Sequence, residues 1–123
     1  MGVKASILIG EDKRFLVDII RESFGKDYRC FCVQTDKDLF EHLNEVDAIV
    51  VGLDVCHAEQ EKRMEMIRMI RSRFNKPILA LTSLQYSSVR IEILKNGADD
   101  VLTKPFNPDE LVVRVEKLLE RYR

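Results

Sequence analysis

Residues 96–106 read Asn-Gly-Ala-Asp-Asp-Val-Leu-Thr-Lys-Pro-Phe, and this stretch joins two predicted helices through one short strand. Gly97 is typical of the glycine that ends a helix, because it adopts a left-handed backbone at little cost. The strand is expected at residues 100–103. Directly after the stretch, Asn107 and Pro108 are typical of the residues that begin a helix, as its cap and its first helical position. The stretch therefore predicts helix, strand and helix in succession.

The same alternation extends back to the N-terminus. Apolar runs too short for helices predict strands at residues 5–10, 28–33, 48–51 and 77–81. Between them, apolar residues recur at helical spacing and predict helices at residues 15–24, 35–45, 59–74 and 87–96. Strands that are apolar throughout are typical of a parallel sheet covered on both faces. We therefore expect an α/β fold, a doubly wound open five-stranded parallel sheet with five helices.

Length and composition restrict the classes of protein to consider. A chain of 123 residues is the size of one domain, so we expect residues 1–123 to form a single domain. With 20 Lys+Arg against 21 Asp+Glu, no overall field draws the chain to nucleic acid or to a membrane surface. No apolar run is long enough to span a bilayer, and we expect a cytoplasmic protein. Cys30 and Cys32 are expected to be reduced core thiols rather than zinc ligands.

Polar side chains follow four of the predicted strands. These residues are Glu11, Asp12, Asp54, Thr82, Ser83 and Lys104. Because the carboxyl ends of parallel strands meet at one edge of the sheet, we expect these side chains to share a cleft. Carboxylates brought together there attract a hard cation such as Mg²⁺. A lysine and a hydroxyl group opposite them suit a phosphoryl group, whose charge they stabilise.

Each of these residues also has a simpler explanation when it is taken alone. Glu11 and Asp12 are explained as acids at the positive end of a helix dipole. Thr82 and Ser83 are explained as a helix cap, and Lys104 as a surface lysine. The hypothesis of a phosphate site rests on all of them falling at one edge of the sheet.

Three segments resemble the receiver domain of two-component response regulators. They are residues 7–12, 79–83 and 96–106, which read Ile-Leu-Ile-Gly-Glu-Asp, Leu-Ala-Leu-Thr-Ser and the stretch quoted above. The resemblance implies the flavodoxin-like receiver fold. It also implies that Glu11 and Asp12 hold Mg²⁺, that Thr82 contacts the phosphoryl group and that Lys104 pairs with the phosphoaspartate. From their place at the strand ends, Asp54 is expected as a further metal ligand and Ser83 as a further phosphate contact. A cis Lys104–Pro105 peptide bond is expected as well.

The chain departs from the family at the phosphoacceptor. Receiver domains carry this aspartate five residues after another aspartate at the start of the third strand, and counting from Asp47 leads to Gly52, which has no nucleophile. Asp54 is two residues further on, about 6.6 Å along an extended chain, beyond the reach of its side chain. It fills the position only if the backbone turns back, a bend that Gly52 permits. We favour the empty position and keep Asp54 as a candidate phosphoacceptor.

A second departure concerns the residue that family members use to report activation. Three residues before Lys104 they carry an aromatic side chain that rotates inward, and this chain has Val101, which is β-branched and stiff. Residues 55–60 also lack the Met-Pro and Asp-Gly typical of the family. The missing phosphoacceptor and the missing aromatic together favour a pseudo-receiver, in which the scaffold remains and regulated phosphorylation is lost.

Three functions agree with these features to different degrees. The leading hypothesis is a non-enzymatic protein-interaction module that binds a protein partner through its fourth helix, fifth strand and fifth helix. A histidine kinase is a candidate partner, and a homodimer is left open. The alternative is a conventional phosphorylatable receiver that uses Asp54 with Mg²⁺. A more remote alternative is a small Mg²⁺-dependent phosphoesterase built on Glu11, Asp12 and Asp54, for which no base is identifiable.

Overall fold

A computed structural model describes residues 2–53 and 60–122 of the chain. One parallel sheet lies at its centre, with the strand order β2-β1-β3-β4-β5. The strands are β1 (Ala5–Gly10), β2 (Tyr28–Val33), β3 (Ala48–Gly52), β4 (Ile78–Thr82) and β5 (Asp100–Thr103). The chain moves from β1 outward to β2 and then crosses back to β3 and beyond, which is the doubly wound order. The predicted fold class is confirmed.

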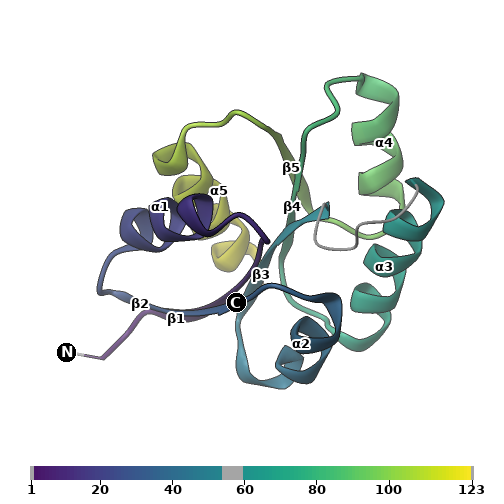
Figure 1. Ribbon diagram of the computed structural model, residues 1–123. Helices are drawn as coiled ribbons and strands as arrows, with labels where there is room; N and C mark the ends of the chain where they lie inside the picture. Colours follow the sequence, from purple (N-terminus) through teal and green to yellow (C-terminus); the bar gives the residue numbers. More distant parts are fainter. Residues whose placement is uncertain (1, 54–59, 123) are drawn as a thin grey trace.

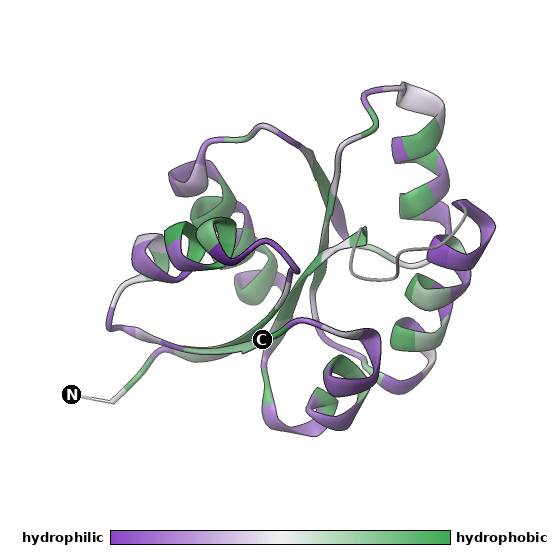
Figure 2. Cartoon of the chain, in the orientation of Figure 1, coloured by the Kyte–Doolittle hydropathy of each residue, from purple (hydrophilic) through white to green (hydrophobic). Residues whose placement is uncertain are grey.

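Helices cover both faces of the sheet (Figure 1). On one face lie α1 (Arg14–Phe24) and α5 (Pro108–Arg121), which pack against each other. On the other face lie α2 (Asp36–Glu41), α3 (Gln60–Arg73) and α4 (Ser87–Lys95). Apolar residues concentrate on the strands between these layers (Figure 2), and all five residues of β3 are buried. A sheet buried on both faces explains why its strands carry no polar alternation.

Local signals in the sequence account for the helix boundaries. Asn107 caps α5, because its side chain accepts a hydrogen bond from the N–H of Asp109, and Pro108 is the first helical residue. Thr35 caps α2 in the same way, by accepting from the N–H of Asp38. Gly25 follows α1 with a φ of 73°, the left-handed backbone expected of a helix-ending glycine. These boundaries agree with the sequence analysis.

The helix predicted for residues 35–45 is shorter than expected. Helix α2 ends at Glu41, and a 3₁₀ helix, η1 (Leu43–Glu45), follows it. The N–H of His42 donates to the carbonyl of Leu39, three residues back, so the last turn tightens at this point. The ring Nδ1 of His42 also lies 3.0 Å from Glu45 Oε2. The apolar periodicity continues through this break, which is why the sequence pattern does not reveal it.

The core is divided into two layers by the sheet. One layer packs α1 and α5 against the sheet, and the other packs α2, α3 and α4 against its opposite face. Within α1 the buried residues are Val17, Ile20 and Phe24, while Phe15 and Ile19 are 65% and 41% exposed. Over residues 2–53 and 60–122, no helix combines the length and the apolar character that a membrane span requires.

Candidate functional site

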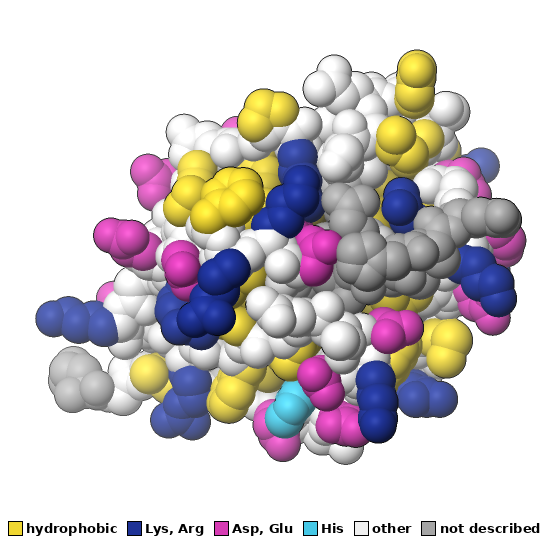
Figure 3. All heavy atoms as spheres, in the orientation of Figure 1, with side chains coloured by type: hydrophobic (Ala, Val, Ile, Leu, Met, Phe, Trp, Pro, Cys, Tyr) yellow, Lys and Arg dark blue, Asp and Glu magenta, His cyan; other side chains and the backbone are white. Residues whose placement is uncertain are grey.

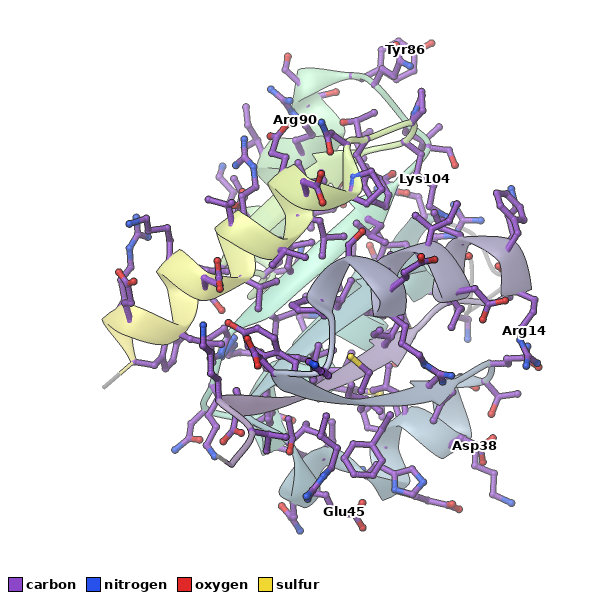
Figure 4. All side chains as sticks on the ribbon, turned by 90° about the vertical axis from the view of Figure 1, so that its left-hand side faces the viewer. Arg14, Asp38, Glu45, Tyr86, Arg90 and Lys104 are labelled. Atoms are coloured by element: carbon purple, nitrogen blue, oxygen red, sulfur yellow. The ribbon has the colours of Figure 1, made fainter. Side chains whose placement is uncertain are left out.

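The carboxyl ends of β1, β3, β4 and β5 meet at one edge of the sheet. The strand pairing places Gly10 beside Val51, Gly52 beside Leu81 and Thr82 beside Thr103. The residues that follow these strands therefore converge, as the sequence analysis predicts for Glu11, Thr82 and Lys104. Lys104 lies where β5 ends and the chain turns toward α5 (Figure 4).

The side chain of Glu11 lies directly over Gly52. Glu11 is fully buried, and Gly52 is the last residue of β3. A Cβ atom built on Gly52 would collide with Oε1 of Glu11 and would lie 3.1 Å from its Cδ. The space that a side chain at position 52 would use is therefore filled by the Glu11 carboxylate.

Lys104 forms an ion pair with the same carboxylate. Its Nζ donates to Glu11 Oε1 at 2.8 Å, and its side chain is 13% exposed. The second oxygen, Oε2, accepts from the N–H of Lys13 at 3.1 Å. Both Glu11 oxygens thus have N–H donors, which is what a fully buried carboxylate requires. The contact with Lys13, just before α1, supports in part the simpler explanation of Glu11 as an acid at a helix N-terminus.

The backbone of Lys104 is held by β4. Its N–H donates to the carbonyl of Thr82 at 2.8 Å, and the Lys104–Pro105 peptide bond is cis, as the resemblance implied. Thr82 is 4% exposed, and its Oγ1 accepts from the N–H of Leu84 at 3.1 Å. The residue that caps α4 is Tyr86, so the simpler explanation of Thr82 and Ser83 as helix caps is wrong. Ser83 is exposed.

The other predicted site residues differ in how far the structure describes them. Asp12 is half-buried beside Glu11. Asp54, the candidate phosphoacceptor and third metal ligand, lies outside the described residues. Val101 is 8% exposed and packs in the layer that contains α3 and α4, where it shares a cluster with Ile93. Its assignment as a switch residue remains a prediction.

The described side chains alone do not form the expected Mg²⁺ site, because Asp54, one of its three predicted ligands, lies outside the described residues. Of the predicted ligands, Glu11 directs one oxygen at the ammonium group of Lys104 and the other at a backbone N–H. Gly52 contributes no carboxylate. Within residues 2–53 and 60–122, no three His, Cys, Asp or Glu side chains are grouped so that they could hold a metal ion. A cation bound by Glu11 would first have to displace Lys104.

A groove of about 620 Å³ lies at the opposite end of the sheet, away from this site. Residues at the starts of β1 and β2 line it, together with one side of α5. Its charges are mixed, with three lysines and three acids: Lys4, Lys76, Lys117, Asp47, Glu116 and Glu120. Tyr28 donates from its hydroxyl to Glu116 across it at 2.7 Å. The mixed charge favours no one class of ligand.

Sequence reasoning missed a polar cluster centred on Arg71. This side chain donates to the carbonyls of Gly97, Phe74 and Lys76 and to Asp99 Oδ2, which also accepts from the N–H of Ile78. The hydroxyl of Tyr122 donates to the other oxygen of Asp99 at 2.9 Å. The cluster joins α3, β4 and α5. No local motif indicates it, because its members are brought together only by the fold.

Cys30 and Cys32 are half-buried, form no disulfide within the described residues and pack against the layer of α1 and α5, and their reduced state stays a prediction. Arg21 donates to the sulfur of Cys32 at 2.8 Å. Burial, with a smaller contribution from Cys32, raises the pKa of the Cys30 thiol to about 11.

Comparisons with known proteins agree with this architecture. The sequence model of the response regulator receiver domain matches residues 7–116. The receiver domain of Francisella response regulator 1452 is 27% identical, with a TM-score of 0.87 over 98% of this chain and 100% of that one. The BeF3-activated receiver domain of DrrB from Thermotoga maritima is 25% identical, with a TM-score of 0.84 and the same coverage. A two-component response regulator from Clostridium difficile, 20% identical, shares the fold with a TM-score of 0.86 over 98% of this chain and 99% of that one.

Proposed function

Because this chain belongs to the response regulator receiver domain family, we propose that it is a pseudo-receiver, a protein-interaction domain of two-component signalling that is not phosphorylated at the end of β3. The observation that carries this proposal is the arrangement of Gly52, Glu11 and Lys104. At the end of the central strand the chain has a glycine, and a neighbouring carboxylate already pairs with the lysine.

Acceptance of a phosphoryl group requires a nucleophile that a phosphodonor can reach. Gly52 has no side chain. Glu11 does not replace it, because its carboxylate is fully buried and both of its oxygens accept hydrogen bonds. A nucleophile activated for group transfer needs an open approach as well as a lone pair. The described part of the site therefore supports a role without phosphoryl transfer at this position.

The proposed contact surface for a protein partner consists of α4, β5 and α5. Large apolar side chains are exposed on it, with Ile91 and Leu94 on α4 at 52% and 45% and Val113 on α5 at 52%. Tyr86, just before α4, is 70% exposed and projects from the body of the fold (Figure 4). Hydrophobic side chains also gather over α4 in the space-filling view (Figure 3). Aromatic and aliphatic groups of this kind are enriched in protein interfaces. A histidine kinase is one candidate partner and a second copy of the chain is another.

Incubation with Mg²⁺ and acetyl phosphate, followed by intact-mass measurement, tests the proposal. We expect no added phosphoryl group. Asp54→Ala and Asp47→Ala are the paired variants, because both remove an aspartate from the region of β3. A labile adduct that Asp54→Ala loses and Asp47→Ala retains would overturn the proposal and establish a conventional receiver that uses Asp54.

A further inference from the structure

We propose that Glu11 is the resident occupant of the site at the carboxyl end of the sheet, and that Gly52 is the residue that makes room for it. This inference deepens the proposed function, since it gives a physical reason why the site is closed. It concerns the packing of two residues and can be tested without any phosphodonor.

The backbone that carries Glu11 is closely packed and hydrogen-bonded. The preceding residue, Gly10, is packed so closely that a Cβ atom there would lie 2.8 Å from Leu39 Cδ1. The N–H of Glu11 itself donates to the carbonyl of Val33 at 3.2 Å. Because the backbone is closely packed at Gly10 and hydrogen-bonded to β2 at Glu11, we expect a side chain at position 52 to cause little backbone shift at Glu11. It would have to move the carboxylate itself.

Charge pairing holds the Glu11 carboxylate over Gly52. A buried carboxylate is costly unless it is paired and hydrogen-bonded, and Glu11 satisfies both conditions through Lys104 and the N–H of Lys13. Lys104 is itself largely buried. Rotation of Glu11 away from Gly52 would separate two charges at a place with little access to water. The pose is thus fixed by charge, and Gly52 supplies the room for it.

Occupation by Glu11 affects two classes of ligand. A divalent cation competes with Lys104 for the Glu11 carboxylate, and a small oxyanion competes with Glu11 for the Lys104 ammonium group. The intact ion pair between Glu11 and Lys104 therefore weakens the binding of the cation and of the oxyanion. The misfit between the described side chains and Mg²⁺ is, on this inference, a property of the Glu11 and Gly52 pair.

A double-mutant cycle between Gly52→Ala and Glu11→Ala tests the inference through thermal unfolding midpoints. In the native background we expect Gly52→Ala to lower the midpoint by several degrees, because the new methyl group meets the carboxylate. In the Glu11→Ala background we expect a much smaller shift, because the methyl group enters vacated space. Asp12→Ala is the matched control, and in that background the shift caused by Gly52→Ala should equal the native one.

Glu11→Gln provides a second arm if Glu11→Ala does not fold. Glutamine keeps the volume of the side chain but loses the charge that holds it over Gly52, so Gly52→Ala should lower the midpoint there less than in the native chain. A shift in the Glu11→Ala or the Glu11→Gln background that equals the native one would overturn the inference. Saturable Mg²⁺-induced amide shifts at Lys13 and Gly52, measured by NMR, would also overturn it. These results are independent of the mass measurement, so the two proposals can fail separately.

Discussion

The ammonium group of Lys104 lies 2.8 Å from Oε1 of Glu11, although the two residues are 93 positions apart in the sequence. Glu11 follows β1 and Lys104 follows β5, so this ion pair spans the carboxyl edge of the sheet across β3 and β4. The pair is largely buried, and its Glu11 carboxylate lies over Gly52, whose missing side chain leaves room for it.

Replacement of Lys104 by methionine should destabilise the fold strongly. The substitution keeps the aliphatic stem and leaves the Glu11 carboxylate buried without its cation, a change that costs about 3–5 kcal/mol. Urea unfolding at neutral pH measures this loss of unfolding free energy. Lys76→Met is the control, because Lys76 and its partner Asp47 are both nearly half exposed and such pairs contribute about 0–1 kcal/mol. Equal losses of unfolding free energy in Lys104→Met and Lys76→Met would contradict the conclusion that the buried Lys104 pair contributes more than the exposed Lys76 pair.

Asp99 should be more important for stability than an ordinary surface acid. In Asp99→Ala the buried N–H of Ile78 loses its acceptor, and Arg71 loses an ion pair, with an expected cost of at least about 1–3 kcal/mol. Asp99→Asn keeps an acceptor for Ile78 and should recover part of this loss. Asp18→Ala removes only an exposed pair with Arg14 and should cost about 0.3–0.5 kcal/mol. Chemical denaturation compares all three, and an Asp99→Ala effect as small as that of Asp18→Ala would rule out this role.

Two glycines with left-handed φ angles should differ in their tolerance of alanine. Gly25 has a φ of 73° with nothing within 4 Å of a new Cβ, so Gly25→Ala has only the backbone cost of about 1–3 kcal/mol. Gly97 has a φ of 129°, and its new Cβ would lie 2.9 Å from Arg71 Cβ. Gly97→Ala should therefore lower the thermal midpoint further than Gly25→Ala does. The reverse order would show that the contact with Arg71 relaxes without cost.

The stability of the chain should depend on the Cys30 thiol at alkaline pH. The pKa of this thiol is about 11 in the folded chain against an ordinary value of 9.0, so the folded state holds the proton more tightly. This stabilisation is complete below pH 9 and is lost as the pH rises toward 11. Relative to Cys30→Ala, the native chain should lose about 1–2 kcal/mol of unfolding free energy over that range. A difference between the two proteins that is constant with pH would contradict the raised pKa.

Much of the fold follows from patterns that act locally. The strand at residues 100–103, the cap at Asn107 and the glycine stops at Gly25 and Gly97 are all confirmed. Each depends on a residue and its immediate neighbours. The convergence of Glu11, Thr82 and Lys104 follows from a general property of parallel sheets, which is why a single sequence was sufficient to predict it.

The chemistry within the site was harder to predict. The sequence suggested that Glu11 binds a cation with Asp12, which stays a prediction, and it gave no indication that Glu11 pairs with Lys104 over Gly52. Whether a carboxylate contacts a metal ion or an ammonium group depends on the shape of the space around it. Here that space is set by the absence of a side chain on a different strand. A glycine at the end of the central strand was the only signal available, and it indicated an empty position rather than an occupied one.

A crystal structure grown with Mg²⁺ and beryllofluoride tests the central claim most directly. We predict that the Glu11 carboxylate remains on Lys104, over Gly52, with neither Mg²⁺ nor beryllofluoride bound at this edge of the sheet. A beryllofluoride group attached to Asp54 and contacting Lys104, with Mg²⁺ beside Glu11 and Asp12, would contradict the claim and establish a phosphorylatable receiver.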